Sequence, residues 1–449
     1  MTTPGRSARS LRKDVLSILH SCIKASDPLY AIKKRVKLKR GKLWVDSHSY
    51  DLRLIKRVFV IGAGKASARM AQAIEELFGD RISSGIIITK KGHHLPLRGR
   101  IDLMEGAHPL PDREGLKGTR RIVKLLSPTA PDDLVIFLLS GGGSALLVSP
   151  VAGISLRDKI KLTDELLRCG ADIKEINTIR KHISQVKGGR LAELAQPSPV
   201  LTLILSDVIG NRLDSIASGP TAPDRTTFSD CMKIVKKYDL RKKIPSSIYS
   251  HLEKGAGERL KETPKPRDPI FKKVKNVIIG SNRTALGAAE RKARELGFNT
   301  YVLPRPVAGD TTRAAKRQVT LIRRIAERKG PVRPPACVIS GGETTVKIKG
   351  KGKGGRNQEF ALVAAMGIEG MKNVVLLSAG TDGTDGPTDA AGAICDGETV
   401  RRALRKGLNP KSSLADNDSY HFFGKLGDLV VTGPTHTNVM DVHLALIGG

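Results

Sequence analysis

The sequence has few aromatic residues, few cysteines and no long apolar run. Phenylalanine, tyrosine and tryptophan together make up 4% of the 449 residues. Aromatic platforms for base stacking are therefore scarce, which argues against nucleic-acid binding as the main role. The five cysteines, Cys22, Cys169, Cys231, Cys337 and Cys395, include no C-x-x-C pair. We expect neither a disulfide framework nor a thiolate zinc site.

The longest apolar runs, 360–366 and 134–139, are far too short to span a bilayer. The basic N-terminal segment 1–13 is not followed by the apolar core and small-residue cleavage site of a secretory signal. We therefore expect a cytoplasmic protein with no membrane partner.

Acidic residues are also scarce relative to basic ones. The chain has 44 Asp and Glu against 77 Lys and Arg, a formal net charge of +33. Such a positive potential attracts nucleotides, phosphorylated metabolites and RNA alike, so it does not select a ligand. An RNA- or polyanion-binding protein remains one alternative interpretation.

Apolar strand patterns alternate with amphipathic helical patterns, which predicts an α/β fold with largely parallel sheets covered by helices. In the first half we expect strands at 57–61, 85–89, 134–139 and 200–205, and helices at 67–78, 113–126, 156–167 and 173–194. A second series of strands is expected at 274–279, 300–303, 336–340, 374–377, 429–432 and 442–447. The stretch 261–268 combines proline with charge, as surface linkers do. This predicts an N-terminal Rossmann-like domain over 1–265 and a C-terminal α/β domain over 270–449.

A first glycine loop, GAGKAS, follows the strand at 57–61 and opens a helix. Gly62 and Gly64 allow backbone N–H groups to approach an anion, and Lys65 adds a full charge. The dinucleotide pattern Gly-x-Gly-x-x-Gly is incomplete because Ser67 takes its last position. An NAD(P)-dependent reductase of a hydroxy or keto acid is therefore a second alternative. A tight turn would explain the glycines without a ligand, but not the lysine.

A second loop, Ser140-Gly141-Gly142-Gly143-Ser144, follows the most apolar strand of the chain. Three consecutive glycines cost conformational entropy, and close backbone contact with a phosphate is the usual compensation. We expect this loop to contact a nucleotide. The segment SGGETT, which contains Gly342 and Glu343, repeats the design in the C-terminal half.

Several charged residues follow predicted strands. Asp207 comes after the strand at 200–205, where a carboxylate can hold Mg²⁺ or accept a hydroxyl proton; a helix cap is the competing explanation. Asp382 and Asp385 lie in an oxygen-rich loop that suits Mg²⁺, although Asp-Gly pairs also form ordinary turns. Arg356, in GKGKGGRN, has the fork geometry that matches phosphate or carboxylate, whereas a flexible basic loop is the alternative.

Eight segments in order resemble the class II glycerate kinases, whose C-terminal domain is named MOFRL. They are GAGKASARMA, EGAHPLPD, LLSGGGSALL, EINTIRKHISQVKGGRLA, SDVIGNRLDSIASGPTAPD, SGGETTVKIKGKGKGGRNQEFAL, AGTDGTDGPTDAAGAICDG and NDSYHFFGKLGDLVVTGPTHTNV. The resemblance runs from about Leu11 to the end of the chain. It implies phosphorylation of D-glycerate by ATP and Mg²⁺, usually at the 2-hydroxyl to give 2-phosphoglycerate, in a cleft between two α/β domains.

The resemblance also implies roles for particular residues. It assigns the phosphate-contacting lysine to Lys65, the cleft arginine to Arg356 and the acidic group near the transferred phosphate to Asp207. It adds Lys187 and Asn357 to the nucleotide-binding set. We expect Lys65 and Arg356 to face each other across one groove.

One departure from the family pattern affects the expected metal ligands. Relatives carry acidic residues just after SDVIG, where this chain has Asn211 and Arg212. The metal expectation therefore shifts to Asp207 with Asp382 or Asp385. Glycerate and ATP are the expected small-molecule partners, and homodimer formation stays open.

Overall fold

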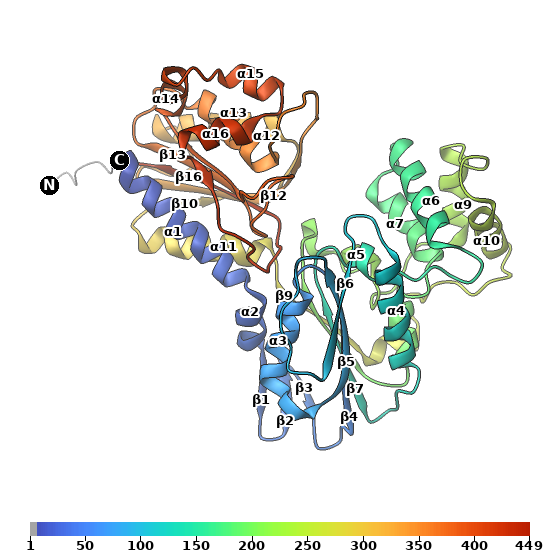
Figure 1. Cartoon of the computed structure of the whole chain (residues 1–449). Helices are drawn as coiled ribbons and strands as arrows, with labels where there is room; N and C mark the ends of the chain where they lie inside the picture. Colours follow the sequence, from blue (N-terminus) through green and yellow to red (C-terminus); the bar gives the residue numbers. More distant parts are fainter. Residues whose placement is uncertain (1–6) are drawn as a thin grey trace. The chain divides into compact units, whose positions relative to one another are not determined.

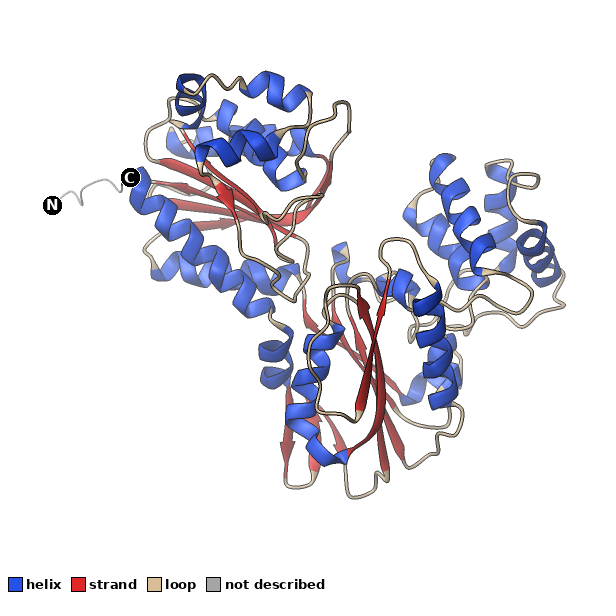
Figure 2. Ribbon diagram, in the orientation of Figure 1, coloured by secondary structure: helices blue, strands red, loops and turns tan. Residues whose placement is uncertain are grey.

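The computed structural model describes residues 7–449, so the first six residues of the basic N-terminal segment lie outside the described residues. The chain forms two compact units. One comprises Pro28–Ile279, and the other combines the described residues up to Asp27 with Gly280–Gly449. Helices and strands alternate in both units (Figure 2), which confirms the predicted α/β fold.

This division differs from the expected 1–265 and 270–449 at both ends. The first helix, α1 (Ala8–Ser26), belongs to the C-terminal unit because its apolar face packs on α11, β13 and β16. The strand β9 (Val274–Gly280), expected to open the C-terminal series, instead completes the sheet of the unit that precedes it. The chain therefore passes between the units near residues 27 and 280.

In the unit of residues 28–279, a six-stranded sheet has the order β6-β5-β4-β7-β8-β9. The strands from β6 to β8 pair in parallel. Their bounds are β4 (Arg57–Ala63), β5 (Ile82–Lys90), β6 (Ile101–Gly106), β7 (Asp133–Leu139) and β8 (Val200–Leu205). A separate antiparallel sheet contains β1 (Val36–Lys39), β2 (Lys42–Val45) and β3 (His48–Asp51).

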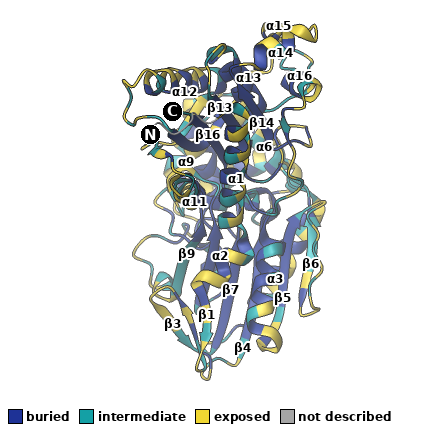
Figure 3. Cartoon of the chain, turned by 90° about the vertical axis from the view of Figure 1, so that its left-hand side faces the viewer, coloured by how far each residue is buried: buried dark blue, intermediate teal, exposed yellow. Residues whose placement is uncertain are grey.

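The parallel sheet is buried on both faces by helices, as Figure 1 shows. The helices are α3 (Ser67–Phe78), α4 (Arg113–Leu126), α5 (Gly143–Leu146) and α8 (Arg190–Leu194). The helix α2 (Pro28–Arg35) packs on α3 and β1. Every residue of β7 is buried, which explains why its sequence is a continuous apolar run. Figure 3 shows this burial along β4 and β7.

Register brings the two predicted glycine loops together. In the β4–β7 pair, Ala63 is opposite Leu139, and in the β7–β8 pair Leu139 is opposite Ile204. All three strands therefore end at the same edge of the sheet, where ligand sites of open α/β sheets form.

A group of helices forms its own apolar core in the same unit. It consists of α6 (Leu156–Arg168), α7 (Ile173–His182), α9 (Phe228–Lys237) and α10 (Ser246–Ala256). The continuous helix expected over 173–194 is wrong: α7 ends at His182 and α8 begins at Arg190. Gly188 and Gly189 have φ angles of +58° and +86° in the intervening turn, which a helix does not allow.

Within residues 280–449, a seven-stranded sheet has the order β10-β12-β16-β13-β14-β15, and β11 also pairs with β12. The strands are β10 (Asn299–Val302), β11 (Val307–Asp310), β12 (Ala336–Thr345), β13 (Val374–Gly380), β14 (Gly392–Asp396), β15 (Leu429–Val430) and β16 (Asp441–Ile447). The strand β16 runs antiparallel between β12 and β13. Its first residue, Asp441, is opposite Gly342 and Gly380, so it lies at the strand ends.

Helices cover both faces of this mixed sheet (Figure 1). The helices α1 and α11 (Asn282–Glu295) lie on one face, and α12 (Thr311–Ala326) and α13 (Arg356–Gly367) lie on the other. The helices α14 (Thr399–Arg405), α15 (Pro410–Ala415) and α16 (Ser419–Leu426) complete the second layer. Within residues 7–449, no helix combines the length and apolar character needed to cross a bilayer.

Candidate active-site loops

The two glycine loops of residues 28–279 pack directly on each other. Lys65 N–H donates to the carbonyl of Gly141 over 2.8 Å, and Ala66 N–H donates to Ser140 Oγ over 3.0 Å. Gly64, with φ +140°, leaves no room for a side chain, since a Cβ there would lie 2.1 Å from Ser140 Oγ. Close packing therefore explains the glycine and Ser140, which is 1% exposed.

The backbone N–H groups of the two loops differ in whether they already donate to an acceptor within the protein. In the first loop, the N–H groups of Gly64, Lys65, Ala66 and Ser67 all donate to protein acceptors. In the second loop, no acceptor among residues 7–449 receives the N–H groups of Gly141, Gly142 or Ser144. The second loop can therefore hold an anion through its backbone, whereas the first loop offers the side chain of Lys65.

Lys65 and His108 lie over the second loop. A Cβ at Gly142, where φ is +85°, would be 3.4 Å from Lys65 Cγ and 3.0 Å from His108 Cδ2. His108 belongs to the segment EGAHPLPD, which follows β6. Three strand ends thus contribute to the surface around Gly142, to which Lys65 adds a positive charge.

A strained turn borders the second loop. Ser144 Oγ lies 3.2 Å from Ser218 Oγ, which in turn donates to Asn177 Oδ1 over 3.0 Å. Ala217 and Ser218 have φ angles of +49° and +63°, which are costly for residues other than glycine. Lys187 supports this turn, because its Nζ donates to the Ala217 carbonyl over 3.1 Å.

Asp207 follows the carboxyl end of β8 at the edge that carries the glycine loops. It is half-buried. A carboxylate in this position can accept a proton from a substrate hydroxyl or contribute one oxygen to Mg²⁺.

The second group of predicted residues belongs to the C-terminal unit. Arg356 begins α13 and binds Asp441 through both ends of its guanidinium fork, over 2.6 Å and 3.0 Å. It also pairs with Glu343 over 2.8 Å, which keeps its planar group fixed while the side chain stays 34% exposed. Burial raises the pKa of Asp441 to about 6, although Arg356 acts in the opposite direction.

Asn357 and Gly342 have structural partners that account for them. Asn357 Nδ2 donates to Asp385 and Asp441, and its Oδ1 accepts from Ser378 Oγ. Gly342 packs so closely on β11 that a Cβ would lie 2.0 Å from the Val307 carbonyl oxygen. Asn357 therefore helps to fix Asp441, which binds Arg356. Gly342 allows the close packing of β12 on β11 next to Glu343, which also pairs with Arg356.

The predicted metal ligands differ in their fit to Mg²⁺. Asp385 caps α13, because its two oxygens accept the N–H groups of Asn357 and Gln358 over 3.0 Å and 2.8 Å. Asp382 Oδ1 accepts from Thr384, as in an Asx turn. Within residues 7–449, no cluster of three ligating side chains occurs. A nucleotide-bound Mg²⁺ needs only one or two carboxylates from the protein. The oxygens of Asp385 are already used at the start of α13, whereas Asp207 and Asp382, which belong to different units, each stay a candidate for a single ligand.

Sequence reasoning missed Asp441, Lys159 and Arg180. Asp441 is fully buried at the start of an apolar strand. A single carboxylate that opens an apolar strand is the sequence pattern that could have identified it. Lys159 lies on the face of α6 that also buries Leu162 and Leu166. In the sequence, Lys159 precedes the two leucines by three and seven residues, which places all three on one helix face and predicts that the lysine is buried with them.

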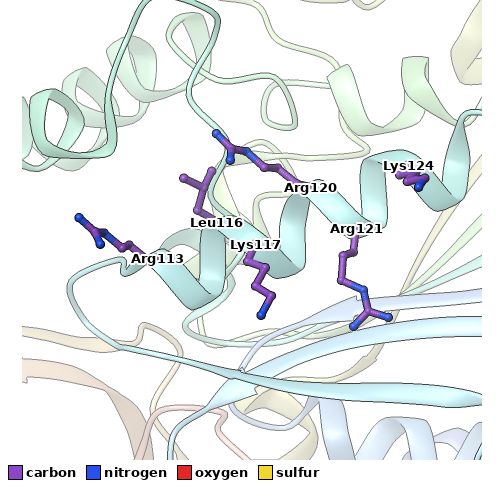
Figure 4. Close-up of a pocket in the computed structure, with 6 residues that line it drawn as sticks. All are labelled: Arg113, Leu116, Lys117, Arg120, Arg121 and Lys124. Carbon is purple, nitrogen blue, oxygen red and sulfur yellow. The ribbon is translucent and has the colours of Figure 1, made fainter.

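The basic surface of α4 does not form a converging site. Arg113, Lys117, Arg120, Arg121, Lys124 and Leu116 line a hollow of about 480 Å³. Figure 4 shows these cations projecting from the helix in different directions. Arg121 pairs with Asp102 and Lys117 approaches Glu114. This arrangement is typical of a solvated basic surface.

Known proteins resemble the chain over its whole length. The profile "Domain of unknown function (DUF4147)" matches residues 14–253, and the MOFRL family profile matches residues 336–441. A glycerate 2-kinase of Pyrococcus horikoshii is 41% identical, over 98% of each chain. A putative hydroxypyruvate reductase of Agrobacterium vitis is 43% identical, over 87% of this chain and 100% of its own.

The solved structures agree in fold. The crystal structure of a glycerate kinase from Thermotoga maritima has a TM-score of 0.87 at 40% identity, over 98% of this chain and 100% of its own. The motif resemblance is confirmed by these matches. The chain belongs to the glycerate kinase family that joins a DUF4147 domain to a MOFRL domain.

Proposed function

We propose that this protein is an ATP- and Mg²⁺-dependent kinase that phosphorylates D-glycerate at the 2-hydroxyl. The observation that carries the proposal is the second glycine loop. Its unused amides at Gly141, Gly142 and Ser144 lie beside Lys65, which is an arrangement suited to phosphate oxygens. Relatives named glycerate 2-kinase and D-glycerate 2-kinase, 41% and 42% identical over nearly the whole chain, support the same activity.

Phosphoryl transfer depends on positioning and charge stabilisation more than on covalent chemistry. In this proposal the loop 140–144 and Lys65 hold the phosphates, and Asp207 accepts the hydroxyl proton or contributes a metal ligand. Arg356, preorganised by Asp441 and Glu343, stabilises charge on the transferred group. In the unit of residues 28–279, Asp207 is the carboxylate that would contribute a ligand to Mg²⁺, and Asp382 is the candidate ligand in the C-terminal unit; when bound, Mg²⁺ neutralises phosphate oxygens.

The reductase named among the relatives is the alternative. A dinucleotide cradle needs free amides in the first glycine loop, because the pyrophosphate binds there. In this chain the N–H groups from Gly64 to Ser67 are already used. Lys90 and Lys91 also replace the acidic ribose ligand expected at the end of the next strand. The loop contacts therefore favour the kinase.

The purified protein is tested with D-glycerate and ATP–Mg²⁺ for ADP release, and with D-glycerate and NAD(P)⁺ for reduced cofactor. Coupling the product to enolase distinguishes 2-phosphoglycerate from the 3-phosphate, because enolase dehydrates only the former. Lys65→Met should lower kcat by about 100-fold, and the exposed Lys91→Met serves as a matched control. Reduction of NAD(P)⁺ without ADP release would overturn the proposal.

A further inference from the structure

Two buried lysines and a partly buried arginine lie close together beside the strained turn at Ala217 and Ser218. Lys187 is fully buried and Lys159 is 4% exposed. The Nε atom of Arg180 is also enclosed. Lys159 comes from α6, Arg180 from α7 and Lys187 from the loop after α7. Lys159 and Arg180 are both close enough to Lys187 to repel its charge, so three segments converge here.

These cations lack anionic partners. Within the described part of the chain, Lys187 Nζ donates only to the Ala217 carbonyl. The Nε atom of Arg180 has no hydrogen-bond partner among residues 7–449, and no carboxylate of the described residues acts on the charge of Lys159. Burial lowers the pKa of Lys187 well below its ordinary value, and Lys159 and Arg180 lower it further by repulsion. Burial, with repulsion from Arg180, also lowers the pKa of Lys159 to about 8.

The two basic residues that follow Arg180 on α7 do have carboxylate partners. Lys181, the residue after Arg180, pairs with the buried Asp224 over 3.1 Å. His182 lies 3.1 Å from Glu262. The same helix therefore has carboxylate partners for Lys181 and His182 and none for Arg180. A buried cation without a partner is costly, so such a group indicates a ligand that supplies the missing charge.

The position of the three cations limits what that ligand is. The turn that Lys187 supports contacts the second glycine loop, because Ser218 meets Ser144 and a Cβ at Gly143 would lie 3.1 Å from Ala217 Cβ. Lys187 thus lies beside the turn that contacts the phosphate-binding loop proposed above, and Lys159 and Arg180 lie close enough to Lys187 to repel it. Their burial suits a small anionic group and not a solvated triphosphate.

Building on the glycerate kinase function proposed above, we propose that Lys159, Arg180 and Lys187 form a binding pocket for the carboxylate of the hydroxy-acid substrate. The guanidinium and ammonium groups supply the charge-assisted hydrogen bonds that a carboxylate accepts. The polar groups of Ser144, Ser218 and Asn177, on the side toward the glycine loop, can bond the hydroxyl groups of the same small acid.

The test compares the full-length protein with Lys159→Met and Arg180→Gln, and with Lys161→Met as a control, since Lys161 is exposed on the same helix. Steady-state kinetics are measured with D-glycerate and with D-glyceramide, which lacks the carboxylate charge. Lys159→Met should raise KM for D-glycerate by about 30-fold and leave KM for ATP and the rate with D-glyceramide unchanged. Lys161→Met should behave as wild type.

Each outcome decides the proposal. An unchanged KM for D-glycerate in both variants overturns it, and a rise in KM for ATP alone would place the triphosphate in the pocket instead. Thermal unfolding with D-glycerate or inorganic phosphate provides a readout that needs no turnover. Wild type that is stabilised by D-glycerate but transfers no phosphate would refute the kinase and retain the pocket. Loss of the D-glycerate stabilisation in Lys159→Met supports the pocket, whereas its persistence contradicts it.

Discussion

Replacement of the buried Lys159 by methionine should make the substrate-free protein more stable near pH 7. Burial holds the pKa of Lys159 at about 8, against an ordinary value of 10.5. This difference corresponds to about 3 kcal/mol of folding free energy at pH 7. Methionine keeps the apolar stem that packs beside Leu162 and Leu166 and removes only the charge.

The pH dependence identifies the cause. Between pH 8 and 10.5 the unfolded chain holds a proton on Lys159 that the folded protein has released, so the stability of wild type rises with pH across this window. The advantage of Lys159→Met should therefore be full below pH 8 and vanish near pH 10.5. Arg180 repels Lys159 directly. Lys187, whose pKa is also lowered, is present in both wild type and Lys159→Met, so the comparison between the two proteins isolates the effect of Lys159.

Urea unfolding followed by circular dichroism at pH 7, 8, 9 and 10 measures this difference. Lys161→Met controls for the loss of a surface charge on α6 and should change stability by no more than about 0.5 kcal/mol. A less stable Lys159→Met protein at pH 7 would refute the reasoning. A stability gain that does not change with pH would also refute it, because desolvation of the ammonium would not be its cause.

Further outcomes follow from the same contacts. Arg356→Ala should lower kcat by about 100-fold or more and the free energy of unfolding by about 2 kcal/mol, because Asp441 stays buried without its partner. Adding Asp441→Asn should restore stability in denaturant titrations but not kcat; recovery of both would remove Arg356 from the chemistry. Gly142→Ala should lower kcat/KM for ATP at least about tenfold, since φ is +85° and the methyl group would reach His108; unchanged kinetics would argue against phosphate at this loop. KM for D-glycerate should rise as pH passes about 8 in wild type and stay flat in Lys159→Met, as initial rates over pH 6.5–9.5 would show.

Strand ends and loops could be predicted from the sequence because their signals are local. The apolar run of β7, the helix at Arg113–Leu126 and the glycine loop at 140–144 were all evident from pattern alone. The break between α7 and α8 was not, because the periodic apolar pattern continues past His182, where α7 ends, and through the turn that contains Gly188 and Gly189.

Long-range partners could not be predicted in this way. The sequence pattern around Asp385 predicts a metal ligand, whereas in the structure its oxygens accept the first N–H groups of α13. The free amides of Gly141 and Gly142 differ from the used amides of the first loop only through contacts between the two loops. Lys159 gave a local signal, but its meaning depends on Arg180 and Lys187, which come from other segments.

The membership of α1 in the C-terminal unit has a consequence for how the chain folds during synthesis. The apolar face of α1, including Leu11, Val15 and Ile18, leaves the ribosome before the whole of residues 28–279. Its packing surface includes β16, which is the last strand made and lies between β12 and β13. The inserted unit can mature while α1 waits, so this nascent helix is where a chaperone would be needed for the longest time.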